Sequence, residues 1–114
     1  MAYDEKLAER VRAAVAGEAD LTERRMFGGL AFMLAGNMFC GIVREELMLR
    51  LGPDGASAAL DRPHVRPMDF TGRPMRGMVF VAPAGLRGAA VRRWVDQAAA
   101  FARTLPPKEI RSQQ

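Results

Sequence analysis

Apolar side chains recur at helical spacing near both ends of the chain. Close to the start they occupy one stripe, made of Tyr3, Leu7, Val11, Ala14 and Val15. Spacings of three and four residues predict an amphipathic helix there, ending near a glycine at position 17. A longer stripe near the other end predicts a second helix, which the prolines at 106 and 107 stop. Its members are Val91, Trp94, Val95, Ala98, Phe101, Ala102 and Leu105.

Between these helices, three short apolar runs predict a β-meander over residues 30–34, 38–43 and 47–51. The third run alternates at period two, which is typical of a strand with one buried face. Gly36-Asn37 favours a tight turn between the first two runs, because both residues tolerate a positive φ. Residues 18–23 are predicted to form a connection, and one helical turn capped by Asp20 or Thr22 is the alternative. The strand predicted over 30–34 could begin as early as Arg25.

The second half of the chain reads as helix, two strands and helix. A Gly-Pro-Asp-Gly stretch at 52–55 interrupts the sheet, and Asp54 or Ser57 is predicted to cap a short helix through Leu60. Two weaker strands follow over 65–69 and 75–81, the earlier one irregular or at a sheet edge because it contains Pro67. The pattern predicts one α+β domain of order α-β-β-β-α-β-β-α over residues 1–105, followed by a flexible tail at 106–114.

Composition excludes several classes of protein. The 114 residues are 49% hydrophobic, which is incompatible with a disordered chain, yet no apolar run approaches the ~20 residues of a membrane span. The first 20 residues lack the apolar core of a secretory signal. These features predict a cytoplasmic protein without a membrane partner.

The net charge of +4 is unevenly distributed. Residues 1–23 hold three basic and six acidic side chains, so the rest of the chain is strongly basic, and 15 of the 17 basic residues are arginine. Such a basic body favours weak attraction to polyanions, although dispersed arginines more commonly form a solvated surface. The candidates for contact with a polyanion or a partner are Arg24, Arg25, Arg87, Arg92, Arg93 and Arg103.

Reactive side chains are scarce. Cys40 is the only cysteine and lies in an apolar run, which predicts a small buried hydrophobe in a reducing compartment rather than a nucleophile. His64 is the only histidine and is predicted to be a solvated loop residue, because a metal site needs several converging ligands. No spacing indicates a catalytic triad, a metal site or a cofactor site. An enzymatic hypothesis would require a deep pocket that holds Cys40 or His64 beside a charged group.

Three further patterns each admit a functional and a structural interpretation. Gly28-Gly29 could let backbone amides approach a phosphate, or could form a tight bend that buries Phe27; the apolar strand behind it favours the bend. An aromatic strand of the RNA-recognition type is disfavoured by the predicted order of elements. The seven methionines after Met1 could form an adaptable binding surface, but their place within strand patterns favours core filling.

A family resemblance rests on these same residues. The stretch Arg25-Met26-Phe27-Gly28-Gly29 before an apolar strand resembles the signature of the N-terminal domain of the TfoX/Sxy competence regulators. The strands at 38–43 and 47–50, the segment at 72–83 and the closing Trp94 helix resemble it too, over about residues 3–105. One departure is Met48, which stands where the family often has an aromatic residue. A second is that full-length regulators carry another, C-terminal domain.

The resemblance implies a secretion-chaperone-like fold with a curved antiparallel sheet packed by helices. It also implies a non-enzymatic regulatory or adaptor role in bacteria, near transcription, with no catalytic residues to carry over. The first functional hypothesis is therefore contact with a protein partner or with a second copy of the chain as a homodimer. The alternative is direct, weakly specific nucleic-acid binding through the arginine-rich body.

Overall fold

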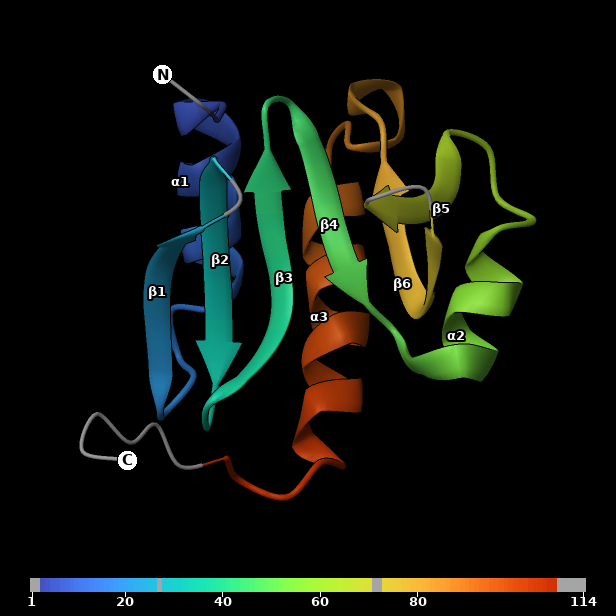
Figure 1. The fold of residues 1–114 in the computed structure, drawn as a ribbon. Coiled ribbons are helices and arrows are strands. Elements are labelled where there is room, and N and C mark those ends of the chain that lie inside the picture. Colours follow the sequence, from blue (N-terminus) through green and yellow to red (C-terminus); the bar gives the residue numbers. More distant parts are fainter. Residues whose placement is uncertain (1–2, 27, 71–72, 109–114) are drawn as a thin grey trace.

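The computed structural model describes residues 3–26, 28–70 and 73–108 (Figure 1). It confirms the predicted α+β class and the relative order of the predicted elements. The elements are α1 (Glu5–Ala14), β1 (Leu21–Met26), β2 (Gly29–Leu34), β3 (Asn37–Val43), β4 (Glu46–Arg50), α2 (Gly52–Ala59), β5 (Val65–Phe70), β6 (Arg73–Val81), the 3-10 turn η1 (Pro83–Gly85) and α3 (Ala90–Arg103).

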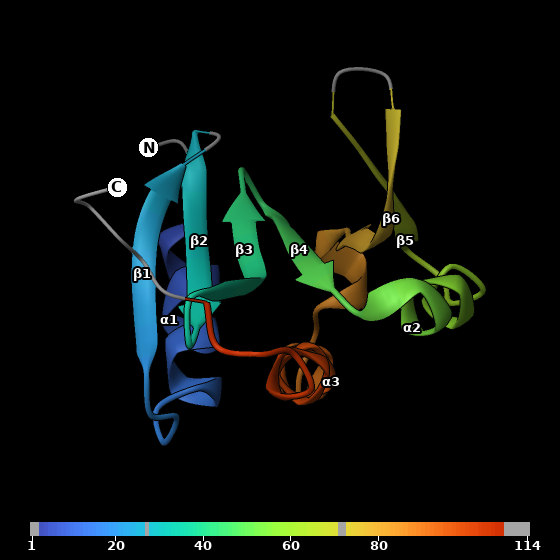
Figure 2. The same cartoon turned by 60° about the horizontal axis from the view of Figure 1, so that its bottom comes forward.

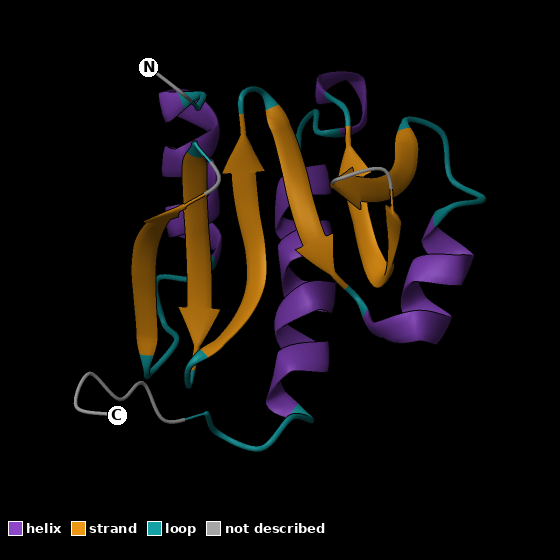
Figure 3. Cartoon of the chain, in the orientation of Figure 1, coloured by secondary structure: helices purple, strands orange, loops and turns teal. Residues whose placement is uncertain are grey.

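One open antiparallel sheet organises the domain. Its six strands lie in the order β1-β2-β3-β4-β6-β5, so β1 and β5 are the two edges. Helices α1 and α3 cover one face of strands β1–β4, and β5 and β6 turn toward the other side (Figures 2 and 3). The prediction that Pro67 marks an edge or an irregularity is confirmed on both counts, since β5 is an edge strand and its register shifts between Pro67 and Asp69.

The sequence prediction missed β1. Residues 18–23 were expected to form a connection, but β1 runs from Leu21 to Met26 and pairs with β2 over six consecutive residues. Its four central residues are exposed. Because the segment LTERRM lacks an apolar alternation, it gives no strand signal of its own. It becomes a strand because β2, which is nearly all buried, offers an unpaired edge beside it.

The turn between β2 and β3 lies one residue earlier than predicted. Ala35 and Gly36 have φ of 50° and 83°, while Asn37 already belongs to β3 and is buried. The Asn37 side-chain amide donates a hydrogen bond to the carbonyl of Pro106 (3.0 Å), and the backbone N–H of Lys108 donates to the carbonyl of Ala35 (2.7 Å). These bonds attach residues 106–108 to the β2–β3 turn and satisfy a buried polar group.

The short helix α2 begins without the predicted side-chain cap. It starts at Gly52, directly after β4, with Leu51 at the N-cap position and a proline in its first turn. Asp54 and Ser57 therefore lie inside the helix instead of capping it. The positive φ of Gly52 (80°) turns the chain from strand to helix, and a proline at the first positions of a helix loses no hydrogen bond.

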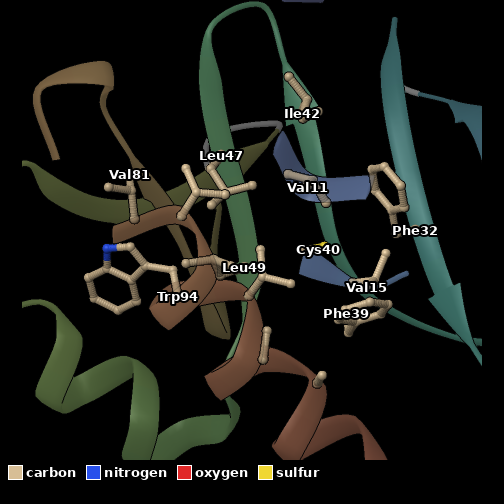
Figure 4. Close-up of a cluster of buried hydrophobic side chains, with 14 of the residues drawn as sticks. Val11, Val15, Phe32, Phe39, Cys40, Ile42, Leu47, Leu49, Val81 and Trp94 are labelled. Carbon is tan, nitrogen blue, oxygen red and sulfur yellow. The ribbon is translucent and has the colours of Figure 1, made fainter. Parts of the chain in front are cut away.

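The main core lies between the sheet and the helices α1 and α3 (Figure 4). Trp94 and Val95 of α3, Val11 of α1 and alternate residues of the central strands are buried there. This confirms most of the two predicted apolar stripes; Ala14, Phe101 and Leu105 are only partly buried. A second cluster lies on the opposite face of the sheet. It consists of Met48, Met68, Met78 and Phe80, with Met38 and Val43 partly buried against them. Core filling is thus confirmed for three of the methionines.

Candidate functional site

The five-residue motif at 25–29 spans the end of β1 and the start of β2. Met26 of β1 pairs with Gly29 of β2, and Gly28 between them has a φ of 72°. Gly29 packs directly on β3, because a Cβ built on it would lie 2.1 Å from the backbone oxygen of Ile42. The predicted tight bend at Gly28-Gly29 is therefore confirmed. Phe27, which the bend was expected to bury, lies outside the described residues.

The six arginines predicted to contact a partner or polyanion divide among three places. Arg24 and Arg25 are exposed on the edge strand β1. Arg103, the last residue of α3, is hydrogen-bonded to the carboxylate of Glu18. The remaining three are exposed around the start of α3: Arg87, Arg92 and Arg93. Two of this last group, Arg87 and Arg93, line one cavity, whereas Arg92 donates a hydrogen bond to the carbonyl of Ala13 on α1.

A cavity of about 370 Å³ lies beside the start of α3. Arg87 and Arg93 line it, and the loop between α2 and β5 adds Arg62 and His64. The complete lining is Arg62, Pro63, His64, Ala84, Gly85, Arg87, Ala90, Arg93, Trp94 and Gln97. Sequence reasoning missed this grouping, because Arg62 and His64 are separated from Arg87 and Arg93 by two strands and the η1 turn.

The loop that carries Arg62 and His64 is held against η1 by backbone contacts. The carbonyl of His64 accepts a hydrogen bond from Ala82 N–H at 2.9 Å, and His64 itself has a φ of 69°. Gly85 leaves room for His64, since a Cβ at residue 85 would lie 3.1 Å from the His64 Cβ. His64 is an exposed loop residue, as predicted, but it also lines the cavity.

The cavity is electropositive. The guanidinium of Arg62 lies over the Trp94 ring, 5.4 Å from its centroid, in a cation–π contact that orients it. No carboxylate of residues 3–26, 28–70 or 73–108 lines the cavity, and within that same part of the chain Arg62, Arg87 and Arg93 form no ion pair. The acidic residues nearest in sequence, Asp61 and Asp96, are exposed and are not among its walls.

The edge strand β1 is attached to α1 by a bidentate ion pair. Arg12 Nε and Nη2 donate to the two carboxylate oxygens of Glu23 at 2.8 and 2.9 Å. The hydrogen bond from Arg12 lowers the pKa of the Glu23 carboxyl below its ordinary value. The pair is about two-fifths exposed on the arginine side, so its net stabilisation is at most about 1 kcal/mol. Its main effect is to position β1 beside the helix.

Cys40 is fully buried in β3, and burial raises the pKa of its thiol. The prediction of a small buried hydrophobe is confirmed. An enclosed, protonated thiol is a poor nucleophile, which removes Cys40 from the enzymatic hypothesis. Among the described side chains, no three of the His, Cys, Asp or Glu type are close enough to share a metal ion.

The arrangement of helices around an open antiparallel sheet defines a small α+β domain whose candidate surfaces are an edge strand and a basic cavity. A family model described as the TfoX N-terminal domain matches residues 9–102, and the chain belongs to that family. Comparisons with curated proteins and with solved structures gave no match. Of the described helices, none has both the length and the apolar character needed to cross a bilayer.

Proposed function

We propose that this protein is a non-enzymatic regulatory or adaptor domain that acts through protein–protein contact, and that a second copy of the chain docks on β1. The family supports a competence-regulator-like role. The single observation that supports this contact is that the outer edge of β1 is unpaired among the described residues. Its six residues pair with β2 without a bulge, and within the described residues no other strand pairs with its outer side.

The hydrogen-bonding groups of β1 alternate in direction. In an antiparallel pair every second residue bonds to its neighbour strand, and the residues between them direct N–H and C=O outward. Ala35 N–H donates to the carbonyl of Asp20 (3.0 Å), and Met26 and Gly29 flank a two-residue turn, so the even-numbered residues face β2. Glu23 and Arg25 then direct their backbone groups outward, where a partner strand can pair with them.

Self-pairing of β1 is favoured by its charges. Around a two-fold axis at Arg24, an antiparallel partner would place Glu23 of each copy opposite Arg25 of the other. Opposite charges at directly paired positions stabilise a sheet, whereas the Arg24 side chains of the two copies would meet as like charges. Because each Glu23 carboxylate already accepts hydrogen bonds from Arg12, the Arg25 of the partner copy would join an existing ion pair. Two such contacts outweigh one unfavourable pair, so this register is the one we expect.

Arg25→Pro is expected to weaken self-association by about tenfold or more, because proline removes an outward N–H and fills the pairing edge. The substitution removes no bond to β2, so the fold should persist. Arg24→Ala is the matched control, since it removes an exposed arginine of the same strand but keeps every N–H. It should associate at least as tightly as the unmodified chain.

The measurement is mass in solution by light scattering over a range of concentrations, with circular dichroism as a check on folding. A dimer that persists in a folded Arg25→Pro variant would contradict docking at β1. A chain that stays monomeric at all concentrations would contradict self-association altogether.

A further inference from the structure

The cavity at the start of α3 is lined by basic side chains, and no acidic side chain among the described residues lines it. Three arginines, Arg62, Arg87 and Arg93, line it together with His64. Arginines on protein surfaces are commonly paired with carboxylates, as Arg12, Arg66 and Arg103 are in this chain. The three cavity arginines stay without such a pair in the described part of the molecule. Their charge is available to a ligand.

From this arrangement we infer that the cavity binds a phosphate monoester group. Guanidinium groups donate parallel hydrogen bonds that fit the oxygens of phosphate. Arg62 lies in the α2–β5 loop, Arg87 in the turn before α3 and Arg93 on α3, so three segments contribute an arginine to the cavity. A monoester carries close to two negative charges at neutral pH, whereas a carboxylate or a phosphodiester carries one. The doubly charged group therefore balances three arginines best.

The start of α3 adds to this preference. Its N-cap residue, Ala89, makes no side-chain capping hydrogen bond, and its first turn holds no acidic residue. The partial positive charge of a 14-residue helix is thus not offset locally, and Ala90 of the same turn lines the cavity. The volume of about 370 Å³ accommodates a small molecule or a single side chain rather than a folded segment.

Two sources can supply the same group: a small phosphorylated molecule, or a phosphorylated side chain of a partner protein. The site is separate from the proposed docking edge, because the cavity lies beside α3 and the α2–β5 loop, and β1 is the sheet edge opposite β5. The proposal of phosphate binding and the proposal of self-association can therefore be contradicted independently of each other, because each is tested by a different experiment.

The test is titration of the full chain with phenyl phosphate, followed by NMR shifts of the backbone amides of residues 84–93. The expected result is saturable binding that the double substitution Arg87→Gln/Arg93→Gln weakens by about tenfold or more, as for loss of charge-assisted hydrogen bonds. Arg92→Gln is the matched control, since Arg92 is an exposed arginine of the same helix that does not line this cavity. It should change the affinity less than about twofold.

Two further ligands distinguish a monoester from a diester, and a phosphorylated protein side chain from a small phosphorylated molecule. Dimethyl phosphate, with a single charge, should bind at least about tenfold more weakly than phenyl phosphate. A short phosphoserine peptide that binds more tightly than phenyl phosphate would identify a protein side chain as the source, and the reverse order would identify a small molecule.

Three results would overturn the inference. One is the absence of shifts at about 10 mM phenyl phosphate, which is beyond the range of a useful site. Another is an equal loss of affinity in Arg92→Gln, which would indicate general attraction to a basic surface. The third is a preference for dimethyl phosphate or a short oligonucleotide over phenyl phosphate, which would indicate nucleic-acid backbone binding instead.

Discussion

Trp94→Ala is expected to lower the free energy of unfolding by about 3–5 kcal/mol, because it removes a large aromatic side chain from the main core. Trp94 is 7% exposed and lies on α3 among the strand residues of the main core, close to Val81 (Figure 4). The indole also makes the cation–π contact with the guanidinium of Arg62. Truncation therefore leaves a void in the core and releases a cavity arginine at the same time.

The experiment is urea denaturation followed by circular dichroism, since Trp94 is the only tryptophan and the variant loses its fluorescence signal. Trp94→Phe is the control, because it keeps an aromatic ring in the core and should cost markedly less than alanine. A denaturation midpoint for Trp94→Ala equal to that of the unmodified chain would show that α3 contributes little to the core.

The two glycines of the family motif are expected to respond very differently to alanine. Gly29→Ala should destabilise the fold by about 3 kcal/mol or more, because its Cβ would collide with the backbone oxygen of Ile42, which no side-chain rotation can relieve. At Gly28 no atom of the described residues beyond its chain neighbours lies within 4 Å of the added Cβ, and the cost is that of the left-handed φ of 72°. That cost is about 1 kcal/mol.

Equilibrium unfolding of the two single variants, measured in parallel, tests this ordering. Gly28→Ala serves as the control for Gly29→Ala, since the two changes add the same methyl group at adjacent positions. If Gly28→Ala proved the more damaging, turn conformation rather than strand packing would explain the pair of glycines.

Most of the fold follows from local patterns in the sequence. The α3 stripe and the alternation of Leu47 and Leu49 each predict both an element and its buried face, because burial imposes the period of the element on the side chains. The strand β1 has no such pattern. Its central residues are exposed on both faces, so burial places no constraint on which of them must be apolar. The cap of α2 was missed for a related reason: the turn there is set by Gly52 against Phe101, a tertiary contact.

The candidate site was less predictable than the fold. Sequence reasoning could single out Arg87 and Arg93 as exposed residues of the last helix. The structure places both at the cavity, but only Arg93 lies on α3, because the helix begins at Ala90 and Arg87 belongs to the turn before it. It gave no reason to join them to Arg62 or His64, because that grouping depends on how the α2–β5 loop folds back against η1. Spacing within an element is local, whereas a cavity is formed by contacts between segments that are distant in the sequence.

The enclosed thiol of Cys40 gives this protein a built-in reporter of its own unfolding. Since the chain has one cysteine and it is 0% exposed, an alkylating reagent can reach it only after the strands around it separate. The rate of alkylation under native conditions therefore measures how often the core opens. By the same logic, molecules linked by a disulfide through Cys40 would record a population that had unfolded, and not an assembly of native domains.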